Sequence, residues 1–154
     1  MRAGLATFDA MKFFLLRASF LGMLCEVEAL AGALNDAVAT ADLALQTNPD
    51  ELLYRPAALL LRGELRLRAS QDKSHLDRAE EDFREAIELA RSMGAKSYEL
   101  RATSSFARLL RHTGRREKAR AMLAEIYNWF TEGYDTADLK DAKALLAELG
   151  YEPN

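Results

Sequence analysis

The side chains that could perform catalysis or bind a metal are few in this 154-residue sequence, and they do not converge. His75 and His112 fall on different predicted helices, with no cysteine or acidic residue at metal-ligand spacing, so capping or solvated roles are expected. Cys25 has no base nearby in the sequence to lower its pKa, and burial in a helix contact is favoured over nucleophilic use. The carboxylates of residues 80–82 are adjacent and therefore point around a helix. We predict no catalytic residue, no metal ligand and no cofactor, and hence a protein that is not an enzyme.

A basic cluster near residue 110 is the strongest candidate for a binding site. Basic residues outnumber acidic ones across residues 99–120, and the chain turns acidic after residue 120. Four candidate partner-binding residues lie on one face of the helix predicted at 97–113: Arg101, Ser104, Arg108 and Arg111. The fifth candidate, Glu64, takes the equivalent place in an earlier repeat. Arginine forks in a groove suit carboxylates or phosphates of a partner peptide. The alternative is that these arginines pair with neighbouring acidic faces of the same chain.

Aromatic residues gather between the last two predicted helices. Trp129 and Phe130, with Tyr127 and Tyr134, end the last predicted hairpin. We expect them to seal the stack against the final helix rather than to bind a ligand. That helix, predicted at 136–149, has one apolar face, which is typical of a helix that caps the end of a repeat stack.

The elements that must position these side chains are predicted to be helices throughout. Ala, Leu, Glu and Arg dominate, β-branched residues are scarce, and the chain has only 8 glycines and 3 prolines. Apolar positions recur with the helical period, separated by short breaks. The pattern predicts helices at 8–30, 36–46, 55–69, 75–93, 97–113, 116–130 and 136–149.

Residues with capping chemistry support several of these boundaries. Asn35 is predicted to N-cap the second helix, and Ser74 with Asp77 resembles a capping box at the start of the fourth. Gly114 stands where a helix end favours a positive φ angle. Pro56 is expected in the first turn of the third helix, where its missing N–H costs nothing.

Composition and charge argue against several classes of partner. The net charge of -3 predicts affinity neither for nucleic acid nor for an anionic membrane. The apolar run 13–25 could pass for a signal peptide or lipoprotein anchor. However, Arg17 interrupts it, it is too short to span a bilayer, and Leu24 stands where a lipobox needs a small residue. The single cysteine fits a reducing compartment, and we expect a cytoplasmic protein.

The predicted helices pair as antiparallel hairpins that repeat along the chain. Ala79, Phe83 and Ala86 have the spacing of the second helix of a tetratricopeptide (TPR) repeat, and Gly63 is the small residue of the partner helix. Two looser copies use Ala119, Leu123 and Ile126 with Phe106, Ala107 and Leu110, and Ala37, Ala41 and Ala44 with Leu24 and Cys25.

The chain therefore resembles TPR proteins. The resemblance implies an all-α superhelix of antiparallel helical hairpins in a single domain over residues 1–154. Its parts would be three hairpins and a C-terminal capping helix, at 8–46, 55–93, 97–130 and 136–149. The repeats advance by more residues than the family consensus, so regular superhelical curvature does not carry over.

A narrower resemblance covers about residues 50–150. Segments 61–65, 79–87, 99–109 and 126–140 are similar to the C-terminal repeat region of bacterial proteins that join a class III nucleotide cyclase domain to an AAA/STAND-type ATPase. In that family the resembling region is a sensor or scaffold arm. The sequence has no Gly-x-x-x-x-Gly-Lys-Ser/Thr loop to cradle a phosphate. The resemblance thus implies the arm without its catalytic domains, as a standalone relative, a truncated gene or a fragment.

Two functional hypotheses follow. The first is a non-catalytic protein–protein interaction scaffold whose groove is basic on the third hairpin and binds an acidic or mixed-charge protein segment. The second is a regulatory or sensor arm of a multidomain nucleotide cyclase/ATPase signalling protein. The first predicted helix is also unusually apolar, so a homodimer is expected through it if nothing in the chain covers both of its sides. Its apolar residues include Phe8, Met11, Phe14, Leu15 and Leu21.

Overall fold

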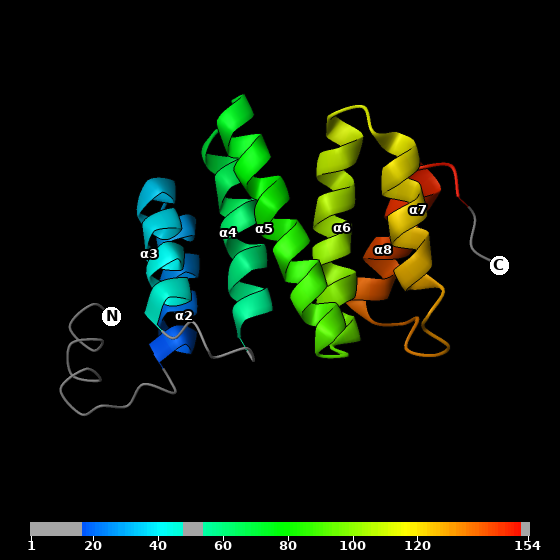
Figure 1. Cartoon of the computed structure of the whole chain (residues 1–154), viewed down its shortest axis with the longest axis horizontal. Helices are drawn as coiled ribbons and strands as arrows, with labels where there is room; N and C mark the ends of the chain where they lie inside the picture. Colours follow the sequence, from blue (N-terminus) through cyan, green and yellow to red (C-terminus); the bar gives the residue numbers. More distant parts are fainter. Residues whose placement is uncertain (1–16, 48–53, 152–154) are drawn as a thin grey trace. The chain divides into compact units, whose positions relative to one another are not determined.

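A computed structural model describes residues 17–47 and 54–151, and within these ranges the chain is helical, with no strand (Figure 1). The helices are α2 (Arg17–Leu30), α3 (Leu34–Thr47), α4 (Arg55–Ala69), α5 (Lys73–Ser92), α6 (Lys96–His112), α7 (Arg116–Tyr127) and α8 (Ala137–Glu148). The predicted all-α fold is confirmed. The first predicted helix lies partly outside the described residues.

The chain forms two compact units, and the boundary between them falls between Asp82 and Phe83, within α5. The first contains α2, α3, α4 and the N-terminal half of α5, and the second contains the rest of α5 with α6, α7 and α8. In the first unit α2 and α3 form a hairpin, and in the second α6 and α7 form another (Figure 1). A single domain of repeated hairpins over the whole chain stays a prediction.

Pro56 and the glycine at the end of α6 stand where the sequence predicted them. α4 spans the predicted residues, with Pro56 in its first turn and no proline in its interior. Gly114 follows α6 at φ 78°, and the next amide, that of Arg115, donates to the carbonyl of Leu110 at 2.8 Å. This hydrogen bond satisfies a carbonyl that would otherwise be free at the end of the helix. It requires a residue in the left-handed conformation, which glycine adopts readily.

Three predicted boundaries are wrong. The cap of α5 is Asp72, whose Oδ1 accepts the backbone N–H of His75 at 2.9 Å, so Ser74 lies inside the first turn and forms no capping box. The helix α3 begins before Asn35, so that residue is not its N-cap. The helix α7 ends at Tyr127 because the amides of Trp129 and Phe130 bond three residues back instead of four, which tightens the chain into a turn.

Small residues let the helices of the first unit approach closely. Cys25 and Ala29 of α2, Ala37 and Ala41 of α3, and Leu65 of α4 form one buried cluster. The side chains that the sequence assigned to this hairpin contact are therefore in the core. Beside them, Thr40 donates a buried hydrogen bond of 2.7 Å to Glu28, which satisfies both polar groups.

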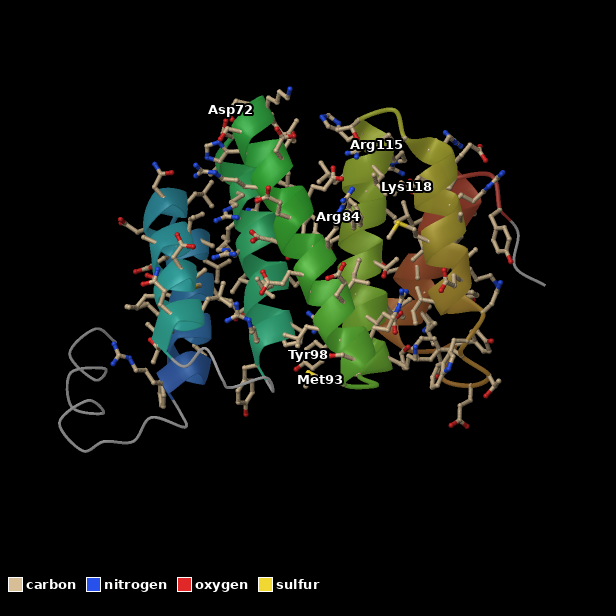
Figure 2. All side chains as sticks on the ribbon, viewed as in Figure 1. Asp72, Arg84, Met93, Tyr98, Arg115 and Lys118 are labelled. Carbon is tan, nitrogen blue, oxygen red and sulfur yellow. The ribbon has the colours of Figure 1, made fainter. Side chains whose placement is uncertain are left out.

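The second unit is built on Phe106, which is 1% exposed. Its ring lies 6.4 Å from that of Phe83. Two cations flank it, the guanidinium of Arg84 at 5.7 Å and the ammonium of Lys118 at 5.9 Å from the ring centroid. Figure 2 shows Arg84 on α5, Arg115 after α6 and Lys118 on α7. The alanines and large side chains that carried the predicted repeat pattern in α5, α6 and α7 are buried: Ala79, Phe83, Ala86, Phe106, Ala107, Leu110, Ala119, Leu123 and Ile126.

Candidate functional site

The predicted arginines of α6 face acidic side chains of α8. Arg108 forms an ion pair with Asp141, and Arg111 forms one with Glu148. The Nε of Arg101 lies 4.0 Å from Oδ1 of Asp138. We call these six side chains the α6–α8 charge strip: Arg101, Arg108 and Arg111 of α6 with Asp138, Asp141 and Glu148 of α8. The structure thus shows the alternative that the sequence left open, in which the arginines pair within the chain.

The apolar face of α8 brings the strip together. The predicted capping helix buries Leu139, Ala142, Leu145, Leu146 and Leu149. Asp138, Asp141 and Glu148 each directly precede one of these buried residues in the sequence. On a helix this places them at the edge of the buried face. The burial of α8 therefore sets its carboxylates beside the arginine face of α6.

Every member of the strip is partly open to solvent. The arginine side chains are 39–51% exposed and the carboxylates 49–58% exposed. Ion pairs of this kind contribute only about 0–1 kcal/mol each, because water competes for both partners. The strip is therefore a surface of alternating charge whose pairs exchange easily.

Ser104 is buried, and Glu64 belongs to the first unit. Ser104 is 4% exposed, and its Oγ is buried without a hydrogen-bond partner in the part of the chain that the structure describes. It is not an open contact residue of the strip. Glu64 is exposed on α4 in the first unit, and its part in the predicted binding set stays a prediction.

The other chemically interesting residues have structural surroundings. Cys25 is fully buried, and burial, reinforced by the nearby Glu28, raises the pKa of its thiol to about 12. The ring of His75 lies 3.0 Å from the Asp72 carboxylate that caps α5. Among the described residues no three His, Cys, Asp or Glu side chains are grouped to hold a metal ion. No helix in the same residues is long and apolar enough to cross a membrane.

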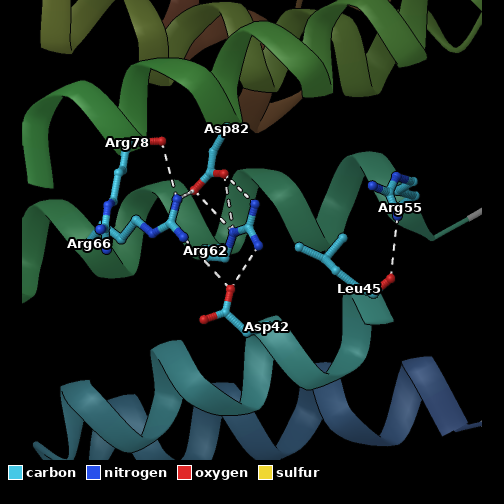
Figure 3. Close-up of polar contacts among 7 residues, drawn as sticks. All are labelled: Asp42, Leu45, Arg55, Arg62, Arg66, Arg78 and Asp82. Carbon is cyan, nitrogen blue, oxygen red and sulfur yellow. Dashed lines mark hydrogen bonds and ion pairs between the residues drawn. The ribbon is translucent and has the colours of Figure 1, made fainter. Parts of the chain in front are cut away.

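A charge cluster that the sequence did not predict joins α3, α4 and α5 in the first unit (Figure 3). Asp82, 3% exposed, accepts from Arg62 at 2.5 Å and from Arg66 at 2.6 Å. Arg62 also reaches Asp42 at 2.7 Å. Burial alone would lower the pKa of Arg62, but its hydrogen bonds to Asp82 and Asp42 raise it instead. Burial raises the pKa of Asp82 against the opposing effect of the same arginines. With two guanidiniums at hydrogen-bond distance, we interpret the cluster as ionised and as a device that fixes helix register.

A second unpredicted network surrounds Glu99, which is 2% exposed. Its carboxylate accepts from Arg91 at 2.9 Å and from Lys96 at 2.7 Å. Burial would raise the pKa of Glu99, but these two cations lower it. Lys96 in turn lies 5.4 Å from the centroid of the Trp129 ring. Lys96 and Glu99 are three residues apart on α6, but Arg91 comes from α5 and Trp129 from the segment after α7, so the whole network cannot be seen in the sequence.

No protein-family model and no curated protein matches this sequence.

Proposed function

We propose that this chain is a non-catalytic, cytoplasmic protein-interaction module of the TPR type, and that the α6–α8 charge strip is its partner-binding surface. The observation that carries the proposal is the strip itself. Three arginines and three carboxylates, all partly exposed, are held on two neighbouring helices. The partner would be a protein segment of alternating charge, with carboxylates for the arginines of α6 and basic groups for the acids of α8.

The weakness of the ion pairs favours exchange with a partner. Breaking a pair such as Arg108–Asp141 costs about 0–1 kcal/mol because both side chains are already hydrated. The leucines of α8 remain buried while this happens, so the helix need not leave its place. A partner that shields the strip from water would strengthen the new pairs, and the planar arginine forks would give them direction.

Reversing the charge of two arginines tests the proposal. The variant Arg101→Glu/Arg108→Glu would be compared with the wild type in affinity capture from lysate of cells that express the chain, read by quantitative mass spectrometry. The matched control is Arg120→Glu, because Arg120 is 40% exposed on α7 and pairs only with Glu117 of its own helix among the contacts seen. Circular dichroism would establish that all three proteins are equally helical.

The proposal predicts a partner that the wild type and Arg120→Glu retain and the double variant loses. Equal retention by all three proteins would contradict the assignment of the strip. Capture of no partner by any of them would contradict the interaction module itself.

Self-association through α2 is a further part of the proposal. Met23, Val27 and Leu30 lie along one face of that helix and are 55%, 49% and 86% exposed. Their spacing of four and then three residues makes a continuous apolar stripe, and such stripes favour association with a second copy. Light scattering at high concentration tests this, and a strict monomer would contradict it.

A further inference from the structure

The end of the second unit where α7 turns toward α8 exposes a large aromatic surface. Trp129 is 57% exposed and Tyr134 is 47% exposed. Both lie in the segment 128–136, between the two helices. Most tryptophan side chains are largely buried in soluble proteins. Exposed tryptophan and tyrosine side chains are enriched at the centre of protein interfaces.

The Trp129 ring is held in a fixed position although it is exposed. Phe130 meets it edge-on with ring centroids 5.2 Å apart. The Lys96 ammonium lies 5.4 Å from its centroid, and that ammonium is tied to the buried carboxylate of Glu99 at 2.7 Å. The indole therefore loses little freedom when a partner binds, and this pre-organisation favours affinity.

The Tyr134 ring is fixed in the same segment. Its hydroxyl donates to the backbone carbonyl of Phe130, and its ring lies 5.8 Å from that of Tyr127. The neighbouring turn between α5 and α6 adds Met93, which is 36% exposed and stands three positions before Lys96 in the sequence. Figure 2 shows Met93 and Tyr98 at this end of the second unit.

The segment that carries the exposed aromatic side chains is itself negatively charged. The segment 128–136 carries two charged residues, Glu132 and Asp135, both exposed. Glu125, in the last turns of α7, is 73% exposed and lies 3.7 Å from Arg91. The nearby cations are already engaged, since Arg91 and Lys96 both bind the buried Glu99. A docking segment would therefore meet an aromatic centre beside an acidic rim.

We propose that Trp129, Tyr134, Glu132 and Asp135 form a second docking surface, whose occupant is a peptide segment that places a lysine or arginine next to an apolar side chain. The apolar side chain lies on the open part of the Trp129 ring. The basic group pairs with Glu132 and Asp135. All four residues lie in the segment 128–136 and none belongs to the charge strip, so the proposal does not depend on the function proposed for the strip.

Selection from a random 12-residue peptide library displayed on phage provides the probe. The library is selected on the immobilised full chain and depleted on the bare support, and a fluorescein-labelled copy of the enriched peptide is titrated by anisotropy. The proposal predicts enriched peptides that contain Lys or Arg beside an aromatic or aliphatic residue. Because Trp129 is the only tryptophan in the chain, binding of the unlabelled peptide should also shift its fluorescence.

Four variants then test the assignment. Trp129→Ala should bind the peptide roughly 30-fold more weakly, the loss typical of an interface hot spot. Glu132→Lys/Asp135→Lys, which changes exposed residues only, should bind at least tenfold more weakly, with a reduced salt dependence. Trp129→Phe should restore most of the affinity, and Arg108→Glu should leave it unchanged. Failure to enrich any peptide, enrichment of acidic peptides, or equal binding to wild type and Trp129→Ala would overturn the proposal. Loss of binding in Arg108→Glu would move the site to the charge strip.

Discussion

Replacing Glu99 by glutamine removes the charge from a side chain that is 2% exposed and binds two cations. Hydrogen bonds to charged groups typically contribute about 1.5–3 kcal/mol each. The glutamine carbonyl can still accept one of the two, and Arg91, at 55% exposure, regains water when it is released. We therefore expect a loss near the lower end, about 2 kcal/mol in the free energy of unfolding. Glu125→Gln is the matched control: the same change at 73% exposure should cost less than about 0.5 kcal/mol.

The pH dependence adds a second test with a definite sign. The two cations lower the pKa of Glu99 below 4.5 in the folded chain. A depressed carboxyl pKa contributes stability that is fully present above the unfolded value and is lost as the pH falls through the folded value. Since glutamine does not titrate, the difference between wild type and Glu99→Gln should be constant from neutral pH down to about 5. It should shrink below about 4.5.

Urea denaturation measures both effects. Fluorescence of Trp129, the single tryptophan, reports on the second unit, and circular dichroism follows the helices. The folded Glu99→Gln spectrum should also shift, because Lys96 exchanges a charged partner for a neutral one and is held less firmly beside the indole. Equal stability of Glu99→Gln and Glu125→Gln at neutral pH would refute the reasoning, as would a difference that grows on acidification.

Three further predictions concern other parts of the chain. Cys25 is buried and its thiol has a pKa of about 12, so at neutral pH it should react with a thiol reagent only as fast as the chain unfolds locally. Mild urea should therefore accelerate the reaction. An immediate reaction without urea would contradict the burial of Cys25. Asp72→Ala should lower the melting temperature because it removes the cap of α5, whereas Ser74→Ala should leave the melting temperature unchanged. If thermal scans instead show a loss for Ser74→Ala and none for Asp72→Ala, Ser74 is the cap, as the sequence predicted. Leu30→Glu should abolish the dimer detected by light scattering. The circular dichroism should not change, because the Leu30 side chain is 86% exposed. A dimer that survives the substitution would exclude the apolar stripe of α2 as the dimer interface.

Local chemistry made much of the fold predictable. Pro56 defines the first turn of α4 by its own geometry, and Gly114 ends α6 because few other residues adopt its φ angle. The buried face of α8 follows from helical periodicity alone. The misplaced cap of α5 shows the limit of such rules, since Asp72 and Ser74 both have capping side chains and stand two residues apart.

The site was less predictable because it depends on pairs that are distant in sequence. The periodicity of α6 put Arg101, Arg108 and Arg111 on one face, but periodicity cannot say which helix covers that face. The burial of Ser104 and of Glu99 has the same cause: a polar residue is buried when a neighbouring helix brings a partner or closes over it. For Glu99 the partners come from α5 and from the start of its own helix.

Photo-crosslinking on the strip tests the central proposal most directly. A benzoylphenylalanine placed at Ala144, or at Arg120 as the control, would be activated in cells that express the full chain. Ala144 is exposed on α8 between Asp141 and Glu148, so the probe leaves every charge of the strip in place. The crosslinked products would then be identified by mass spectrometry. We predict a specific protein adduct from position 144, formed through a segment of alternating charge, and none of that protein from position 120. The same adduct from both positions, or none from position 144, would contradict the proposal that this chain binds a partner through the α6–α8 charge strip.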